Sequence, residues 1–187
     1  DADQVSKTVS AFYMDATEVT LSQWEVVQQW ATLVGGYTDL PAGSGKGPDH
    51  PVHTVTWYDC VKWCNARSKK EGLTPVYYTD EGFTTVYKTG EIDDAYVAWP
   101  TNGYRLPTEA EWEKAARGTL VGNTYPWGNA ITGSDANYDI DGDGTTPVGY
   151  YDGGQVPAGP ARGNGSWVYD IPSNVSQWCW GWSDESW

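Results

Sequence analysis

NGYRLPTEAEWEKAARG, residues 102–118, is the stretch of sequence that decides the fold. Thr108 is a favourable N-cap residue, and Glu111 stands three positions later, so the two form a capping-box pattern. Gly118 follows the last position of the helical pattern and supplies the usual stop. The stretch therefore predicts one short helix between Thr108 and Gly118, entered from an irregular segment that contains a proline.

Two earlier segments carry start signals of the same kind. Thr20 with Gln23 precedes an apolar pattern of helical spacing, which predicts a helix over 21–34 that ends at Gly35 and Gly36. A second helix is predicted from Thr56 to a stop at Gly72.

The rest of the chain favours loops and short strands. Residues 37–51 are rich in Gly, Pro and Asp and indicate a loop. Over residues 74–90, two runs of Tyr, Val and Thr flank Asp80-Glu81-Gly82, which predicts a hairpin. The sequence QWCWGW at 177–182 places tryptophans at every second position and predicts a strand with one aromatic face.

Composition narrows the class of protein. The chain has 187 residues, enough for one domain, with 12 Trp, 13 Tyr and 22 Gly beside only 2 Phe and 1 Met. Large polar-tipped rings and many glycines indicate a loop-rich single domain. The net charge of −14 argues against a nucleic-acid partner, and no apolar run is long enough to span a membrane. Such acidity suits a soluble extracellular protein or one that binds hard cations.

Six segments in this order resemble the formylglycine-generating enzyme family, also called sulfatase-modifying factors. They span residues 12–20, 50–65, 102–118, 125–129, 145–151 and 168–178. The most specific match is RLPTEAEWEKAARG followed by YPWGN. The resemblance implies an irregular, loop-rich α+β fold related to C-type lectins, with few short helices and small antiparallel sheets. It also implies a single domain over 1–187 that lacks the family's first strand and its C-terminal segment.

Catalytic members of the family use two cysteines that hold copper, in a segment after the one matching 168–178. This sequence ends at Trp187, and its three cysteines are Cys60, Cys64 and Cys179. Cys60 and Cys64 fall on an early helix where the family has structural residues, so no catalytic role is transferred to them. They are expected to be small buried side chains or half of a structural bridge.

One acidic segment has the spacing of a cation-binding loop. Residues 139–144 read D-x-D-x-D-G, in which alternate carboxylates converge as in the first half of an EF-hand. Position twelve of that pattern is Tyr150 rather than Glu, which excludes a complete EF-hand. The alternative is a solvated acidic turn. The resemblance implies a first calcium site at the same place, with ligands from Asn137, the backbone carbonyl of Tyr138 and a carboxylate for which Asp141 or Asp143 is the best candidate. Asp139 is added to this site by the loop pattern.

The resemblance also implies a second, weaker calcium site close to the C-terminal match. Its ligands would be the side chains of Asp170 and Gln177 and the backbone carbonyls of Ser173 and Val175. Gln177 stands where the family has Glu, and Ser173 stands where it has Gly. Because one formal charge is lost, binding of a hard cation should be weaker here.

The C-terminal tryptophans have two interpretations. Trp178, Trp180 and Trp182 would offer flat faces to a sugar ring or a peptide if they were exposed, or they would belong to the core.

Two functions follow from these patterns. The first is a non-catalytic binding or structural module that is secreted, periplasmic or on the cell surface, is stabilised by calcium, and has a protein or saccharide partner or self-associates. The alternative is a copper-dependent oxidase that converts a sulfatase cysteine to formylglycine, with its catalytic cysteines outside the chain.

Overall fold

The computed structural model describes residues 8–93, 95–118, 122, 124–125, 129–133, 135–138, 144–151, 168–171 and 173–181. Its contacts divide the chain into two compact units. Unit 1 comprises Asp1–Glu18 with Pro107–Trp187, and unit 2 is Val19–Leu106. Each unit is described by itself, and the single-domain organisation over 1–187 stays a prediction.

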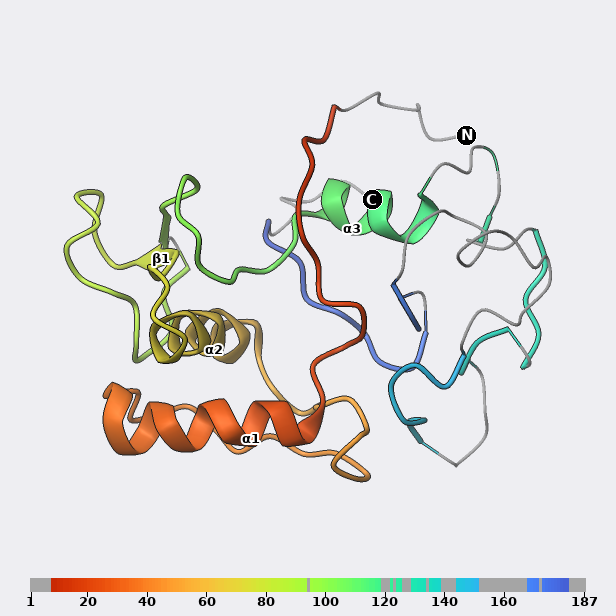
Figure 1. The fold of residues 1–187 in the computed structure, drawn as a ribbon, viewed down its shortest axis with the longest axis horizontal. Helices are drawn as coiled ribbons and strands as arrows, with labels where there is room; N and C mark the ends of the chain where they lie inside the picture. Colours follow the sequence, from red (N-terminus) through yellow and green to blue (C-terminus); the bar gives the residue numbers. More distant parts are fainter. Residues whose placement is uncertain are drawn as a thin grey trace. The chain divides into compact units, whose positions relative to one another are not determined.

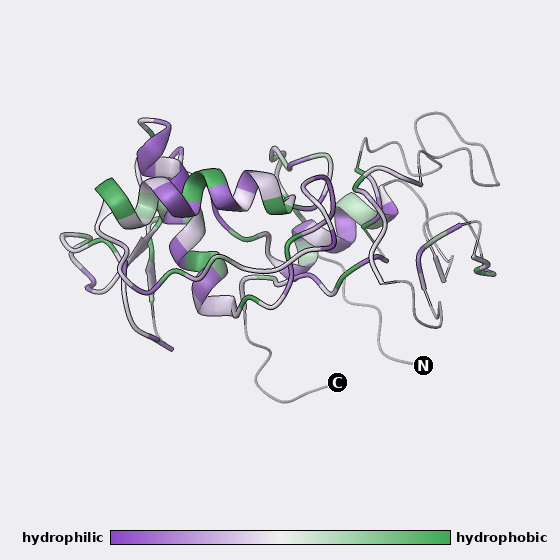
Figure 2. Cartoon of the chain, turned by 90° about the horizontal axis from the view of Figure 1, so that it is seen from below, coloured by the Kyte–Doolittle hydropathy of each residue, from purple (hydrophilic) through white to green (hydrophobic). Residues whose placement is uncertain are grey.

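The helices predicted for unit 2 are confirmed. They are α1 (Leu21–Trp30), continued by a π-helical turn η1 (Ala31–Gly35), and α2 (Trp57–Lys70). Thr20 and Thr56 make the N-terminal capping boxes, and Gly36 takes the left-handed conformation that ends the first helical segment. Apolar and polar residues alternate in patches along the helices, as Figure 2 shows. No helix among the described residues is long and apolar enough to cross a bilayer.

Two stacked indoles hold α1 against α2, which lie side by side in Figure 1. The rings of Trp24 and Trp63 are 5.5 Å apart between centroids and nearly parallel, at 4°. Both indole N–H groups also donate to backbone carbonyls, Trp24 to Pro41 and Trp63 to Trp24. Because the N–H group of each indole is hydrogen-bonded, both rings can be buried in this core without the free-energy cost of an unsatisfied polar group.

A buried amide on α2 organises the chain around the small sheet. Asn65 is fully buried, and its Nδ2 donates to the carbonyls of Tyr77 at 2.8 Å and Tyr87 at 3.0 Å. Its Oδ1 accepts from the N–H groups of Val76 and Tyr77, both at 3.0 Å. One side chain thus satisfies four backbone groups that a wider sheet would otherwise pair.

The sheet is small and antiparallel. β1 (Tyr77–Tyr78) pairs with β2 (Tyr96–Val97), a partner that the sequence did not predict. The predicted turn at residues 80–82 forms as well, because Tyr78 makes an antiparallel bridge to Val86 beyond it. The expected hairpin is therefore confirmed as a bridge rather than as a regular pair of strands.

The last segment of unit 2, just before α3 (Glu109–Arg117), packs tightly within that unit. A side-chain Cβ added at Gly103 would lie 2.1 Å from the carbonyl oxygen of Thr74, a contact that only glycine avoids. Next to it, the N–H of Tyr104 donates to Ser68 Oγ of α2 at 2.7 Å.

In unit 1 the predicted helix is confirmed as α3 (Glu109–Arg117), which begins with a capping box at Thr108. Its Ala115 and Ala116 are buried with Ile171, and the partly buried residues packed against them are Phe12, Met14, Trp112 and Val168. The strand predicted over 177–182 is reduced, within the described part, to a bridge between Trp180 and Thr108.

We predict that replacing Asn65 with leucine strongly destabilises the protein. Four backbone groups would each lose the hydrogen bond to Asn65, although the Tyr77 carbonyl would keep the one from the N–H of Tyr87. Because unsatisfied buried groups cost about 1–3 kcal/mol each, we expect a loss of about 4 kcal/mol. Urea unfolding measures the change. The control Gln29→Leu alters an exposed amide of α1 and should have little effect. A loss below about 1 kcal/mol for Asn65→Leu would show that the amide does not organise this unit.

Candidate functional site

A turn in unit 1 is held by the carboxylate of Asp170. This residue is only 6% exposed, and its carboxylate accepts from the backbone N–H groups of Gly149 and Tyr151. Its φ of 52° lies in the left-handed region, which is uncommon outside glycine. Such backbone conformations gather at ligand-binding turns, where the surrounding contacts hold them in place.

The amide of Asn174 ties three parts of the site together. Its Oδ1 accepts from Asn137 Nδ2 at 3.1 Å and from the N–H of Thr146 at 2.9 Å. Its Nδ2 donates to the carbonyl of Thr146 at 3.2 Å. Asn174 also has a left-handed backbone, with a φ of 70°. The two predicted calcium sites are thereby linked through one side chain.

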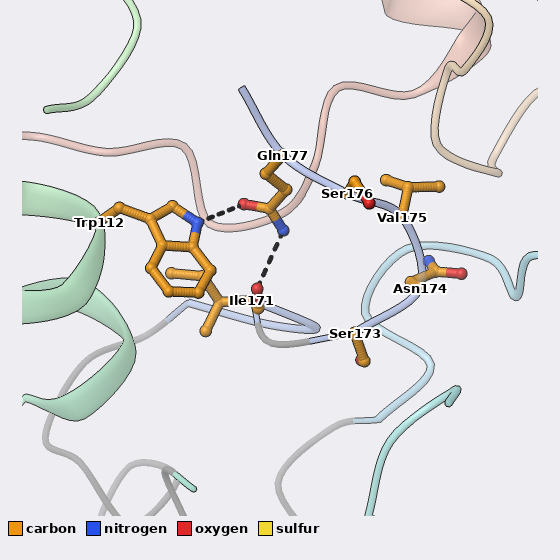
Figure 3. Close-up of a pocket in the computed structure, with 7 residues that line it drawn as sticks. All are labelled: Trp112, Ile171, Ser173, Asn174, Val175, Ser176 and Gln177. Atoms are coloured by element: carbon orange, nitrogen blue, oxygen red, sulfur yellow. Dashed lines mark hydrogen bonds between the residues drawn. The ribbon is translucent and has the colours of Figure 1, made fainter. Parts of the chain in front are cut away.

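Gln177 lines a pocket beside α3. Figure 3 shows its side chain between the indole of Trp112 and the carbonyl of Ile171. Its Oε1 accepts from Trp112 Nε1 at 2.8 Å, and its Nε2 donates to the Ile171 carbonyl at 3.2 Å. A glutamate at this position would have no N–H for that second bond. The uncharged amide of Gln177 thus connects α3 to the turn through two hydrogen bonds.

Glu18 is the least satisfied polar side chain near this site. Both of its carboxylate oxygens are buried, and neither has a hydrogen-bond partner. The pKa of Glu18 is raised to about 8, mainly by burial and also by the charge of the Asp170 carboxylate, while the backbone of Glu18 and the side chain of Asn174 favour the charged form. The hydroxyl of Thr146 is likewise buried without a partner. Unsatisfied buried oxygens of this kind are expected where a ligand or a water completes the site.

The first predicted calcium site falls only partly within the described residues. Asn137 Nδ2 donates to the carbonyl of Gly144 at 3.1 Å, which brings the two ends of this segment together. The hydroxyl of Tyr138 donates to the carbonyl of Ile131 at 3.0 Å. The other predicted ligands, Asp139, Asp141 and Asp143, lie outside the described residues. No group of three or more His, Cys, Asp or Glu side chains suited to a metal occurs in the part that is described.

The residues of the second predicted site do lie together on one turn. Asp170, Ser173 and Val175 follow one another here, and the Ser173 carbonyl accepts from the N–H of Val175 at 2.9 Å. Gln177 lies at the end of the same turn, with its amide used as described above. The calcium assignment itself stays a prediction.

Of the predicted tryptophan platform, Trp178 is 47% exposed and Trp180 is partly buried, whereas Trp182 lies outside the described residues. The three cysteines are present as thiols. Burial raises the pKa of Cys60 far above its ordinary value and that of Cys179 to about 11.

Glu18, Asn174 and Thr146 were not recognised as site residues from the sequence. The sequence did contain a signal for Glu18. It lies an even number of positions from Phe12 and Met14, which pack against the core of unit 1, so in an extended segment all three side chains lie on the same face. A carboxylate on the inward parity of a β-prone stretch predicts a buried charge that needs a partner.

Comparison with known proteins identifies the family. Residues 2–186 match the sulfatase-modifying factor enzyme 1-like domain, and the chain belongs to this family. The predicted family and its α+β fold of few short helices and a small antiparallel sheet are thereby confirmed.

Three known proteins illustrate the range of the family. The chain is 37% identical to the "Chaperone protein LppX" of Paenibacillus barcinonensis, over 94% of this chain and 64% of that protein. It is 33% identical to a formylglycine-generating enzyme of Thermomonospora curvata, over 84% of this chain and 43% of the enzyme. The crystal structure of CarF matches with a TM-score of 0.63 and 29% identity, over 83% of this chain and 62% of CarF. The chain thus spans less than two thirds of these proteins.

We predict a pH dependence of stability that Glu18 sets in chelator-treated protein. Its folded pKa of about 8 exceeds the ordinary 4.5, so the folded state retains a proton that the unfolded state releases. The contribution of this proton to the free energy of unfolding is fully present below pH 4.5 and is lost as the pH rises through about 8. The free energy of unfolding should fall by at most about 1.4 kcal/mol per pH unit. Thermal midpoints from pH 5 to 8 should therefore fall.

The variant Glu18→Gln should flatten this dependence, whereas Glu25→Gln, at an exposed site of α1, should keep it. Equal slopes in the wild type and Glu18→Gln would contradict the prediction.

Proposed function

We propose that this chain is a non-catalytic, calcium-stabilised binding module of its family that acts in a secreted, periplasmic or cell-surface setting. The observation that carries the proposal is the arrangement of its thiols. Copper oxidases of the family, as the resemblance implies, need two cysteines that converge on the metal. Here Cys60 and Cys64 belong to α2 in unit 2, and Cys179 belongs to unit 1.

The chemistry of these thiols does not fit copper. Copper is bound by thiolates, and burial opposes thiolate formation by raising the pKa of Cys60 and Cys179. Cys64 raises the pKa of Cys60 further, because two negative charges on adjacent helical turns would repel each other. Both cysteines of α2 thus suit the protein core better than a redox centre.

A binding role is supported by the relative that is called a chaperone, whose similarity covers 94% of this chain. The exposed rings of Trp178 and Tyr150 in unit 1 offer apolar contact area of the kind that dominates protein interfaces. The net charge of −14 favours a partner with a basic surface, since complementary charge speeds association. We therefore propose a protein partner, with a saccharide or a second copy of the chain as the other candidates.

Calcium fits the described part of the first site. The Asn137 side chain donates through Nδ2 to Gly144 and Asn174, which leaves Oδ1 as the oxygen that a cation would use. Together with the Tyr138 carbonyl and the carboxylates of Asp139, Asp141 and Asp143, it would form an all-oxygen shell, the kind that calcium prefers. Bound there, calcium would offset two of the three negative charges of the neighbouring carboxylates.

The second candidate is the copper-dependent oxidase, favoured by the 33% identity to the Thermomonospora curvata enzyme. In that case the catalytic cysteines would lie outside this chain, and this chain would supply the supporting body of the fold.

We predict that calcium raises the thermal midpoint of the chelator-treated protein by several degrees, because a ligand that binds only the folded state stabilises it. Replacing Asp139, Asp141 and Asp143 together with asparagine should remove most of the rise that the first site provides, at unchanged side-chain size. As a control, Asp49→Asn changes an exposed carboxylate outside the site. An equal rise in the triple variant would contradict this site.

We also predict that the chain, incubated with copper, oxygen and a cysteine-containing sulfatase peptide, forms no formylglycine. The reason is that Cys64 is buried and that burial keeps the thiols of Cys60 and Cys179 protonated by raising their pKa. Mass spectrometry of the peptide, with the authentic enzyme as a positive control, reads out the aldehyde. Aldehyde formed by the chain alone, and lost in a variant with all three cysteines replaced by serine, would establish the oxidase instead.

A further inference from the structure

The side chains of Glu18 and Thr146 are not among the calcium ligands that the family resemblance implies. Both Glu18 oxygens and the Thr146 hydroxyl are buried without hydrogen-bond partners. A buried charge costs several kcal/mol unless something compensates it.

The chain path brings a second carboxylate to the same place. The N–H of Tyr169 donates to the carbonyl of Ala16 at 2.7 Å, so the segment that leads to Glu18 runs beside the one that leads to Asp170. Asp170 is buried, and its charge acts directly on Glu18. Two carboxylates buried together repel each other unless a proton or a cation lies between them.

Asn174 links the backbone of Thr146 to the segment that carries Asp170. Its amide holds the backbone of Thr146 through two hydrogen bonds and lies close enough to Glu18 to favour its charged form. A single proton would satisfy one of the Glu18 oxygens and leave the other, with the Thr146 hydroxyl, without a partner. A hard cation satisfies all of these oxygens together.

The carboxylate that the family has at the position of Gln177 is missing, and Gln177 is not a substitute. Its two polar ends are used in the hydrogen bonds to Trp112 and to the Ile171 carbonyl. A cation near Asp170 therefore needs its second negative charge from another element.

We propose that Glu18 supplies this charge, so that Glu18, Asp170 and the Thr146 hydroxyl bind a calcium ion, distinct from the ion at residues 137–143. The inference rests on the proposed function in one respect, that the module binds calcium. The ion would join the segment before α1 to the turn at Asp170, both within unit 1.

Isothermal titration of the chelator-treated chain with calcium chloride tests the proposal. The wild type should bind two ions. Glu18→Gln removes the charge at constant size and should bind one, or bind the second at least about tenfold more weakly. Thr146→Val removes a hydroxyl that has no hydrogen bond and should weaken the same step while the fold is kept. The control Glu25→Gln should bind as the wild type does.

The outcomes separate this inference from the proposed function. If Glu18→Gln binds calcium with wild-type stoichiometry and affinity, the inference is wrong although the module still binds calcium. If the asparagine triple variant at residues 139, 141 and 143 abolishes all binding, only the first site exists, and Glu18 is then a protonated carboxyl. If the wild type binds no calcium at all, both the inference and the calcium part of the proposed function fail.

Discussion

The fold depends on one constraint, that buried backbone groups in a chain with little regular structure must find side-chain partners. In unit 2, Asn65 forms hydrogen bonds with four backbone groups next to a sheet of two short strands. Asp170 and Asn174 meet this constraint in unit 1, where they hold the segments around Gly149 and Thr146. Buried amides and carboxylates thus replace the ladder hydrogen bonds of larger sheets.

The same constraint explains why the candidate site lies where it does. The side chains of this part of unit 1 include buried oxygen atoms without a hydrogen-bond partner, those of Glu18 and Thr146. Oxygen atoms of this kind favour hard cations over soft ones. Burial, by contrast, raises the pKa of Cys60 and Cys179 and so keeps these two thiols protonated.

The helices could be predicted from the sequence because their signals are local. Thr20, Thr56 and Thr108 each begin a helix through a capping box read from four consecutive residues. The partner of β1 could not be predicted, because Tyr96–Val97 pairs with it across a long stretch of chain. The role of Glu18 was missed for the same reason, since its neighbours Asp170 and Asn174 are distant in sequence.

The three capping boxes also bear on how such a domain can diversify. The first residue of each helix is determined by its own capping box, so the loops between the helices need not determine where the helices begin. Lengthening a flexible loop costs little closure entropy, and surface loops tolerate insertions well. A frame built in this way can present many different surfaces to its surroundings while its interior stays the same, which suits a family whose members bear names as different as chaperone and enzyme.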